Sequence, residues 1–358
     1  GVTEDNVAFP TPIDPTRVQG TVKPETFTVS FQLGLKSVKV LDNSEGSFHE
    51  DGILSDRIET SIADLGKWIN IVYAGTNRGR LGVVESEPAA NQVQVTKATG
   101  LVNILNNFRI DVYTALSGGS ANFTNRKVSA ATTSTRTFTY DGADATPVAG
   151  ESIFMTGTYD TSLWTLPDIV DDGTNLTSPF GQSRSTYAGL KSQVFSNGGV
   201  LRNLSENLIL DACLQTRQIA GKLVNRALSN WGQARKFAEF VSPDRRYTGA
   251  LKGKQNYSVG FDALKIVAPG VDCDLEVDYN IIPRALYLLA WETFGLFESG
   301  APDWIDIDDG GPLHLIPTSG GHKAGVLGYA GSSENQINTM PRGNAVILDC
   351  KDPIVGDI

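Results

Sequence analysis

The sequence predicts an α+β fold in which one long helix supports several small groups of strands. Apolar residues between Asp51 and Tyr73 recur at steps of three and four, as they do on one face of a helix. Most other apolar segments are short and alternate with polar residues, as in strands. Four prolines among the first 24 residues favour an extended arm. The helical stripe consists of Leu54, Ile58, Ile62, Leu65, Ile69 and Val72.

Composition limits the classes of protein that fit this chain. Its 358 residues, 40% of them hydrophobic, suffice for a buried core in about two domains. A net charge of -10 argues against tight binding to a phosphate backbone. Three widely spaced cysteines favour free, buried thiols. The longest apolar run, Ala285 to Trp291, is far shorter than the ~20 residues of a membrane helix, so we expect a buried strand there.

The amino-terminal elements are expected in a clear order. The chain begins with Gly1, which leaves both proteolytic removal and Met trimming open. We expect an arm over residues 1–30 and an extended β loop over residues 31–50. The long helix follows over residues 51–80, where Gly66 should cost about 1 kcal/mol relative to alanine unless a neighbour packs closely. A charge at Ile62 (Ile62→Asp) should prevent soluble folding.

The middle of the chain is expected to be mixed. An all-β insertion is predicted at about 101–158, with strands at 108–113, 135–140 and 152–156 that form a small barrel or a twisted pair of hairpins. A linker rich in Asp, Gly, Thr and Ser follows from Asp168 to Ser185. A helix from Leu204 to Ala220 should begin at the cap Ser205 and bury Ile219, and a shorter helix should run over 233–241.

The last part of the chain reads as a series of strands. The segments with strand character are 286–291, 293–297, 304–307, 313–316, 324–329 and 345–348.

Residues that could carry chemistry are few. His49, His314 and His322 are too scattered to predict a metal site. The acidic run at residues 306–309 lacks the spacing of a calcium loop, and residues 249–254 lack the length and the Ser or Thr of a phosphate loop. No cysteine or serine stands in a recognisable nucleophile motif. We therefore expect neither an enzyme nor a bound cofactor.

Three stretches resemble the major capsid protein of tailed bacteriophages, in the fold named for phage Hong Kong ninety-seven. The first is 27–84, whose Asp-Gly-Ile-Leu-Ser-Asp-Arg-Ile-Glu-Thr run is similar to the family's spine helix preceded by its extended loop. The second is 183–244, with Arg-Ser-Thr-Tyr-Ala-Gly-Leu-Lys and Ser-Pro-Asp-Arg-Arg-Tyr. The third is 286–349, similar to the family's returning strands.

The resemblance implies a division of the chain and a role. Residues 51–80 would be the spine helix of a peripheral domain, 81–284 an axial domain, 285–342 the returning strands of the peripheral domain, and 343–358 a terminal strand and tail. Copies would assemble through hexamers and pentamers into an icosahedral shell around double-stranded DNA, as part of the virion and built in the host cytoplasm. Scaffold, portal and decoration proteins would be further partners, and no membrane would be involved.

An arm and a loop that lie on their own core are costly to order, since each fixed residue loses ~1 to 2 kcal/mol of backbone entropy. A neighbouring copy would offset that cost. The candidate contact residues are Phe9, Phe27, Phe31, Val38, Val40 and Phe48.

Two other classes of protein stay open. One is a β-rich phage tail or secreted binding protein that uses the 101–158 insertion for recognition, and it predicts a monomer or trimer. The other is a hydrolase, which would need His314 or His322 for activity.

Overall fold

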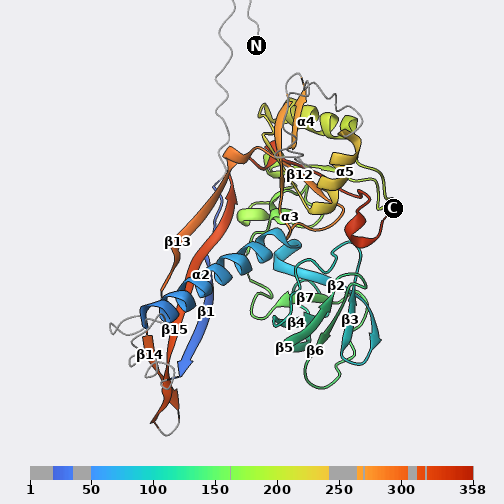
Figure 1. Cartoon of the computed structure of the whole chain (residues 1–358). Helices are drawn as coiled ribbons and strands as arrows, with labels where there is room; N and C mark the ends of the chain where they lie inside the picture. The colour runs from blue at the N-terminus through green and yellow to red at the C-terminus, as the bar shows by residue number, and fades with distance from the viewer. Residues whose placement is uncertain are drawn as a thin grey trace, which may run out of the picture.

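The computed structural model describes residues 19–34, 50–161, 163–241, 264–268, 271–304, 313–318 and 321–357. Its architecture is a mixed one with few helices and three separate β units, in agreement with the α+β prediction (Figure 1). A long sheet lies beside the helix α2, a closed barrel lies on the other side of that helix, and a mixed six-stranded sheet forms the body at its carboxyl-terminal end (Figure 1).

The helix α2 spans Glu50–Ala74, so the predicted long helix is present but ends before residue 80, where β2 begins. Of the predicted stripe, Leu65, Ile69 and Val72 are buried in one cluster, and Ile62 is half-buried. The side chains of Leu54 and Ile58 lie outside the described ones. A Cβ at Gly66 would meet nothing within 4 Å, so no close neighbour explains this glycine.

The last turn of α2 contacts all three β units. Ile71 belongs to the core of the barrel, Ala74 belongs to the core of the body, and Val72 and Tyr73 pack with Leu163 and the long sheet. A helix that is apolar on several faces is surrounded by protein. This end of α2 therefore joins the three cores.

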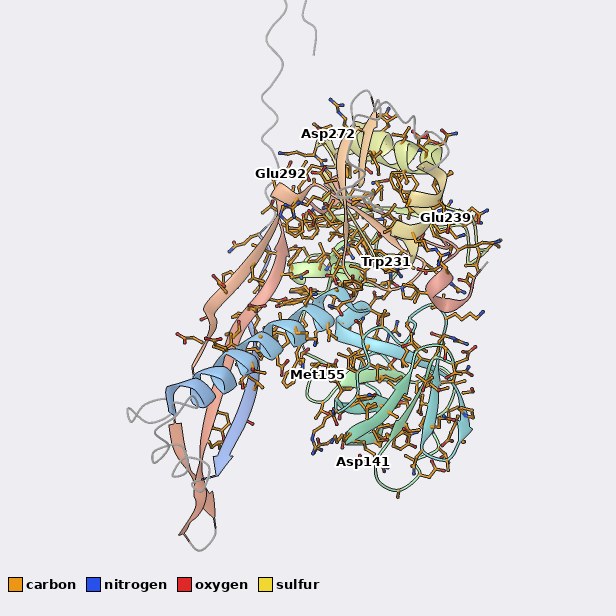
Figure 2. All side chains as sticks on the ribbon, in the orientation of Figure 1. Asp141, Met155, Trp231, Glu239, Asp272 and Glu292 are labelled. Carbon is orange, nitrogen blue, oxygen red and sulfur yellow. The ribbon has the colours of Figure 1, made fainter. Side chains whose placement is uncertain are left out.

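Six strands form a closed barrel in the order β2-β3-β6-β5-β4-β7. Its strands are β2 (Arg80–Ala89), β3 (Gln92–Val95), β4 (Arg109–Tyr113), β5 (Ala121–Thr132), β6 (Thr137–Tyr140) and β7 (Ser152–Met155). The insertion expected from about residue 101 thus starts earlier, at Arg80, because β2 pairs with both β3 and β7 and closes the ring. Met155 lies between the barrel and α2 (Figure 2).

The body is a six-stranded sheet in the order β10-β11-β9-β12-β16-β8. Its central strand carries the apolar run that was expected to be buried: Leu286 and Leu288 face one core, and Tyr287 and Leu289 face the other. The strands are β8 (Gln193–Phe195), β9 (Arg226–Ser229), β10 (Leu264–Ala268), β11 (Val271–Val277), β12 (Leu286–Leu289) and β16 (Ala345–Ile347).

Two helices cover the first of these cores. The helix α4 (Glu206–Ala220) begins at Ser205, whose hydroxyl accepts a bond from the Leu208 amide, as the cap prediction required. The prediction that Ile219 faces inward is wrong, because Ile209, Ala212, Cys213, Thr216 and Ala220 form the buried stripe and leave Ile219 50% exposed. The helix α5 (Trp231–Val241) follows.

The segment predicted as a linker from Asp168 is instead part of a core. The short helix α3 (Leu166–Ile169) begins it, and Arg184 is 1% exposed within it. The Arg184 guanidinium donates to Asp171 at 2.8 Å and to the carbonyls of Asp168, Ile169, Leu176 and Leu190. A buried charge needs partners of this kind, so one arginine organises the whole segment.

The third set of strands forms the long sheet. Its members are β1 (Glu25–Gly34), β13 (Phe294–Trp304), β14 (Leu313–Thr318) and β15 (Gly321–Asn338), with β15 in the centre. The predicted segments 293–297 and 304 onward merge into β13, and 324–329 is the middle of the 18-residue β15. The sheet crosses α2 obliquely and extends away from the body (Figure 1).

Candidate assembly surface

One face of the long sheet packs against α2. Along β1, Phe27 and Val29 are half-buried against the cluster of Leu65, Ile69 and Val72. The rings of Phe27 and Tyr73 meet edge to face, with centroids 5.9 Å apart. Thr26, Thr28 and Ser30 alternate with them and are exposed. This period of two is that of a strand with one covered face.

The two outer strands of the sheet differ in regularity. β1 pairs with β15 over ten consecutive residues, from Glu25 to Gly34, without a register shift. β13 pairs with the other side of β15 and shifts register twice, between Glu298 and Gly300 and again before Asp303. Bulges of this kind protect a sheet edge from further pairing. The outer edge of β1 has no such protection, and no described strand pairs with it.

A row of three carboxylates crosses the sheet near α2. Glu334 on β15 lies opposite both Glu25 on β1 and Glu298 on β13. Burial raises the pKa of Glu334, the Glu298 carboxylate adds to that rise, and a bond from the Ser332 hydroxyl at 2.9 Å opposes it. Like charges directly opposite destabilise a sheet. This row therefore places repulsion between like charges across the sheet, and the Lys23 ammonium, 3.4 Å from Glu25, reduces it.

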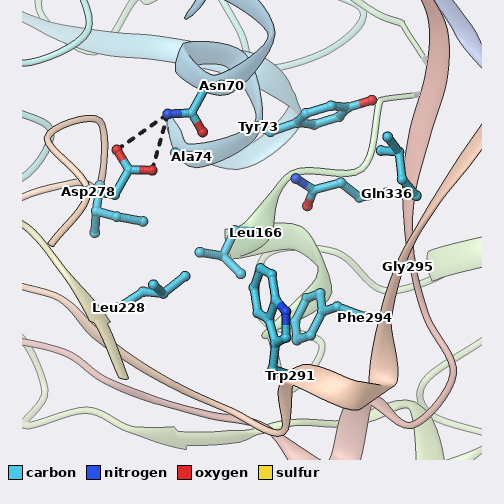
Figure 3. Close-up of a pocket in the computed structure, with 12 residues that line it drawn as sticks. Asn70, Tyr73, Ala74, Leu166, Leu228, Asp278, Trp291, Phe294, Gly295 and Gln336 are labelled. Atoms are coloured by element: carbon cyan, nitrogen blue, oxygen red, sulfur yellow. Dashed lines mark hydrogen bonds between the residues drawn. The ribbon is translucent and has the colours of Figure 1, made fainter. Parts of the chain in front are cut away.

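Apolar side chains are exposed where β13 leaves the body. Trp291, Leu296 and Phe297 are each more than 40% exposed. Trp291 and Leu296 border a cavity of about 310 Å³ between the end of α2, α3 and β13 (Figure 3). Trp291 and Phe294 stack at 5.9 Å and form one wall, and Leu166 and Leu228 form another (Figure 3).

Polar contacts frame this cavity. The Asn70 amide donates to both oxygens of Asp278, at 3.2 and 3.4 Å (Figure 3). The Arg226 guanidinium lies 4.6 Å from the centre of the Trp291 ring, a cation–π contact. An apolar centre with a polar rim is typical of surfaces that bind another protein.

A second cavity, of about 530 Å³, lies between β1, α2 and the barrel. Its apolar wall includes Phe27 from β1, Leu65 and Trp68 from α2, and Phe108 and Met155 from the barrel. Trp68 and Phe108 meet edge to face at 6.3 Å. The cavity therefore lies along the one regular edge of the long sheet.

The described residues contain little that could carry out chemistry. The three cysteines are buried and free, as predicted, and burial raises the pKa of Cys350 to about 11 and that of Cys213 to about 12. Thiols held in the protonated form are poor nucleophiles. Within the described ranges there is no group of three or more potential metal ligands. No described helix is long and apolar enough to cross a membrane.

The predicted contact residues are only partly described. Phe9, Val38, Val40 and Phe48 lie outside the described residues, as does His49. Phe31 lies on β1, but its side chain is not among those described. Phe27 contacts Tyr73 of its own chain and also lines the second cavity.

Sequence reasoning did not identify Trp291, Leu296 or Phe297 as surface residues. Trp291 was the last residue of the strand expected at 286–291, and Phe297 was the last residue of the strand expected at 293–297. Leu296 and Phe297 lie on β13 at the border of the sheet, and Trp291 lies on the short 3-10 turn before it.

No family model and no curated protein matches this sequence. Chains of three solved capsid structures match this chain, each with a TM-score below 0.5. A chain of the cyanophage A-1(L) capsid asymmetric unit matches with a TM-score of 0.49 at 10% identity, covering 91% of this chain and 77% of that one. A chain of the satellite phage P4 procapsid that includes the size determination (Sid) protein matches with a TM-score of 0.38 at 11% identity, covering 98% and 79%. The capsid of an empty GTA particle gives 0.29 at 13% identity, covering 51% and 60%. Because the identities are 13% or less and the TM-scores are below 0.5, we draw no conclusion about function from these matches.

Proposed function

We propose that this chain is a major capsid protein that assembles through hexamers and pentamers into an icosahedral phage head around double-stranded DNA. The observation that carries the proposal is the long sheet. It extends from the body across α2 and ends in a regular outer strand on one side and exposed apolar residues on the other. Such a surface is stable in water when another molecule covers it.

A second copy of the same chain is the partner that accounts for both the open edge of β1 and the exposed apolar residues of β13. Head-to-tail contacts between identical copies close into rings when the rotation between them permits it. The helix α2 joins the sheet, through Tyr73, to the body, through Ala74, and to the barrel, through Ile71. A closed shell requires subunits of defined shape. The junction at the end of α2 would supply that shape. Scaffold, portal and decoration proteins would be further partners of the shell.

The net negative charge of the chain is consistent with DNA as the proposed contents of the shell. A net charge of -10 limits attraction between the shell and packaged DNA. DNA would then be enclosed without sequence-specific binding.

Particle size tests the proposal. Electron microscopy and sedimentation of the purified full chain should show hexamers, pentamers or closed shells of megadalton mass. A chain that stays monomeric or trimeric at all concentrations, and whose barrel binds a ligand, would contradict the capsid role and favour the recognition-module alternative.

A further inference from the structure

We propose that the second cavity, between β1, α2 and the barrel, binds an amphipathic organic carboxylate. The apolar body of this ligand would lie on the aromatic wall, and its carboxylate would pair with Arg109. The inference goes beyond the proposed function and does not depend on contacts between copies. It assigns a small ligand to the space between the long sheet and the barrel.

The size and position of the cavity are those of a ligand site. Its volume of about 530 Å³ lies within the range of roughly 300 to 1,000 Å³ that small-molecule pockets have in proteins. Such pockets form preferentially where separate units of a fold meet. This cavity has walls from a strand, a helix and the barrel. It is therefore large enough for a small organic molecule and lies where one is expected.

The apolar wall is formed by side chains that pack on one another. Trp68 from α2 and Phe108 from the barrel meet edge to face at 6.3 Å. Met155 packs against the cores of both the barrel and α2, and Phe27 and Leu65 complete the wall. A methionine beside aromatic rings adapts to ligands of irregular shape. Burial of an apolar chain on this wall is favourable because it removes the chain from water.

Arg109 gives the cavity a positive end. It is the one charged residue among the described residues that line the cavity, and it is exposed. Its guanidinium donates to the carbonyl and to the side-chain oxygen of Asn125, at 3.2 and 3.1 Å. Both acceptors are neutral, so these bonds do not balance its charge. The nearby Asp111 carboxylate is 4% exposed and accepts bonds from Asn125, Thr156 and Gly157 instead.

A single cation selects a ligand with a single negative charge. A carboxylate accepts two parallel bonds from one guanidinium, whereas a phosphate monoester carries a charge close to −2 and requires more donors. Asn107 also lines the cavity and is exposed, so its amide can donate a further bond. The lining therefore favours a carboxylate as the polar end of the ligand.

Fluorine NMR of the full chain labelled with fluorotryptophan tests the proposal. The chain has five tryptophans, and the Trp68 signal is the one that Trp68→Phe removes. Octanoate is the probe, and octanol and octylamine, which have the same chain with a neutral or positive end, are the controls. We expect octanoate to shift the Trp68 signal saturably and to leave the signal of Trp231, 56% exposed on α5, unchanged.

Calorimetry of the unlabelled chain gives the affinities without any substitution. Octanoate should bind at least about tenfold more tightly than octanol or octylamine, because only octanoate can pair with Arg109. A bound ligand also stabilises the folded state, so octanoate should raise the midpoint of thermal unfolding.

Variants at Arg109 separate recognition of the charge from a structural role. Arg109→Gln should weaken octanoate binding at least about tenfold and leave octanol binding unchanged, whereas a structural defect would weaken both. Arg109→Lys keeps the charge and should recover part of the affinity. Arg235→Gln, at a side chain 64% exposed on α5, is the matched control and should leave the affinity unchanged.

Four results would overturn the proposal. The first is a Trp68 signal that octanoate does not shift, or that shifts no more than the Trp231 signal. The second is equal affinity for octanoate and octanol. The third is an octanoate affinity that Arg109→Gln leaves unchanged. The fourth is tighter binding of octyl phosphate than of octanoate, which would assign the cavity to a different class of ligand.

Discussion

The barrel and the long sheet are both built from antiparallel strands beside α2, but only the barrel closes on itself. Its six strands leave no outer edge, and its core of Val93, Ile110 and Phe138 is fully buried. The long sheet leaves the edge of β1 open and exposes Leu296 and Phe297. Closure makes a β unit independent of partners, whereas an open sheet with apolar borders depends on them. The difference is consistent with the proposed function, in which another copy would cover the sheet while the barrel needs no partner to complete its strands.

The largest expected effect is at the helix that joins the two regions. Leu65→Asp places a charge where the side chain is 1% exposed, and we expect no soluble folded chain. The matched variant Ile62→Asp, one turn earlier at a half-buried position, should remain soluble, in contrast to the expectation from sequence. The soluble yield and circular dichroism of the two variants measure the difference. Equal behaviour of both would contradict the burial of the stripe.

The next effect concerns the buried arginine of the body. Arg184→Ala leaves Asp171 buried without its cation, and the free energy of unfolding should fall by about 3 to 5 kcal/mol. Denaturant unfolding measures this. In the barrel, Arg136→Ala breaks the pair with Glu85, whose side chain is 43% exposed, and should cost less than about 1 kcal/mol. A loss below 1 kcal/mol at Arg184 would show that its network does not stabilise the segment.

A third variant separates folding from assembly. Phe297→Ser removes an exposed apolar side chain from β13, so the free energy of unfolding should change by less than about 0.5 kcal/mol while assembly is reduced. Val148→Ser makes a similar change at an exposed site on the barrel and should affect neither. Light scattering during assembly, together with thermal unfolding, gives both quantities. If Val148→Ser reduced assembly and Phe297→Ser did not, the barrel rather than the long sheet would carry the contacts between copies.

The smallest effect is the pH dependence of the carboxylate row. Because burial and Glu298 raise the folded-state pKa of Glu334, its contribution to stability is fully present below the unfolded pKa of about 4.3 and is lost as pH rises through the folded pKa. Glu334→Gln should therefore be more stable than the natural chain near neutral pH, by less than about 1 kcal/mol. Unfolding at several pH values tests the sign. A natural chain that gains stability relative to this variant as pH rises would contradict it.

Local patterns identified the long helix and the cap at Ser205 because both depend on residues close in sequence. The role of Ile71 and Ala74 could not be predicted, since it depends on which β units surround the end of α2. The polar composition of 168–185 suggested a linker. Composition alone does not show that Arg184 bonds to Asp171, and this bond allows both charges to be buried.

The candidate surface was less predictable than the fold. Candidates were chosen as apolar residues within an expected arm and loop, and four of the six lie outside the described residues. The exposure of Leu296 and Phe297 depends on which strand forms the border of the sheet, which is a property of long-range pairing. The start of the barrel at Arg80 also depends on long-range pairing, because β2 pairs with β7.

Amide hydrogen exchange in the isolated chain and in assembled particles tests most directly whether the long sheet is completed by another copy. Assembly should slow exchange at the outward amides of β1 and leave the barrel strands β2 to β7 unchanged. Equal protection of β1 in both states would contradict the account.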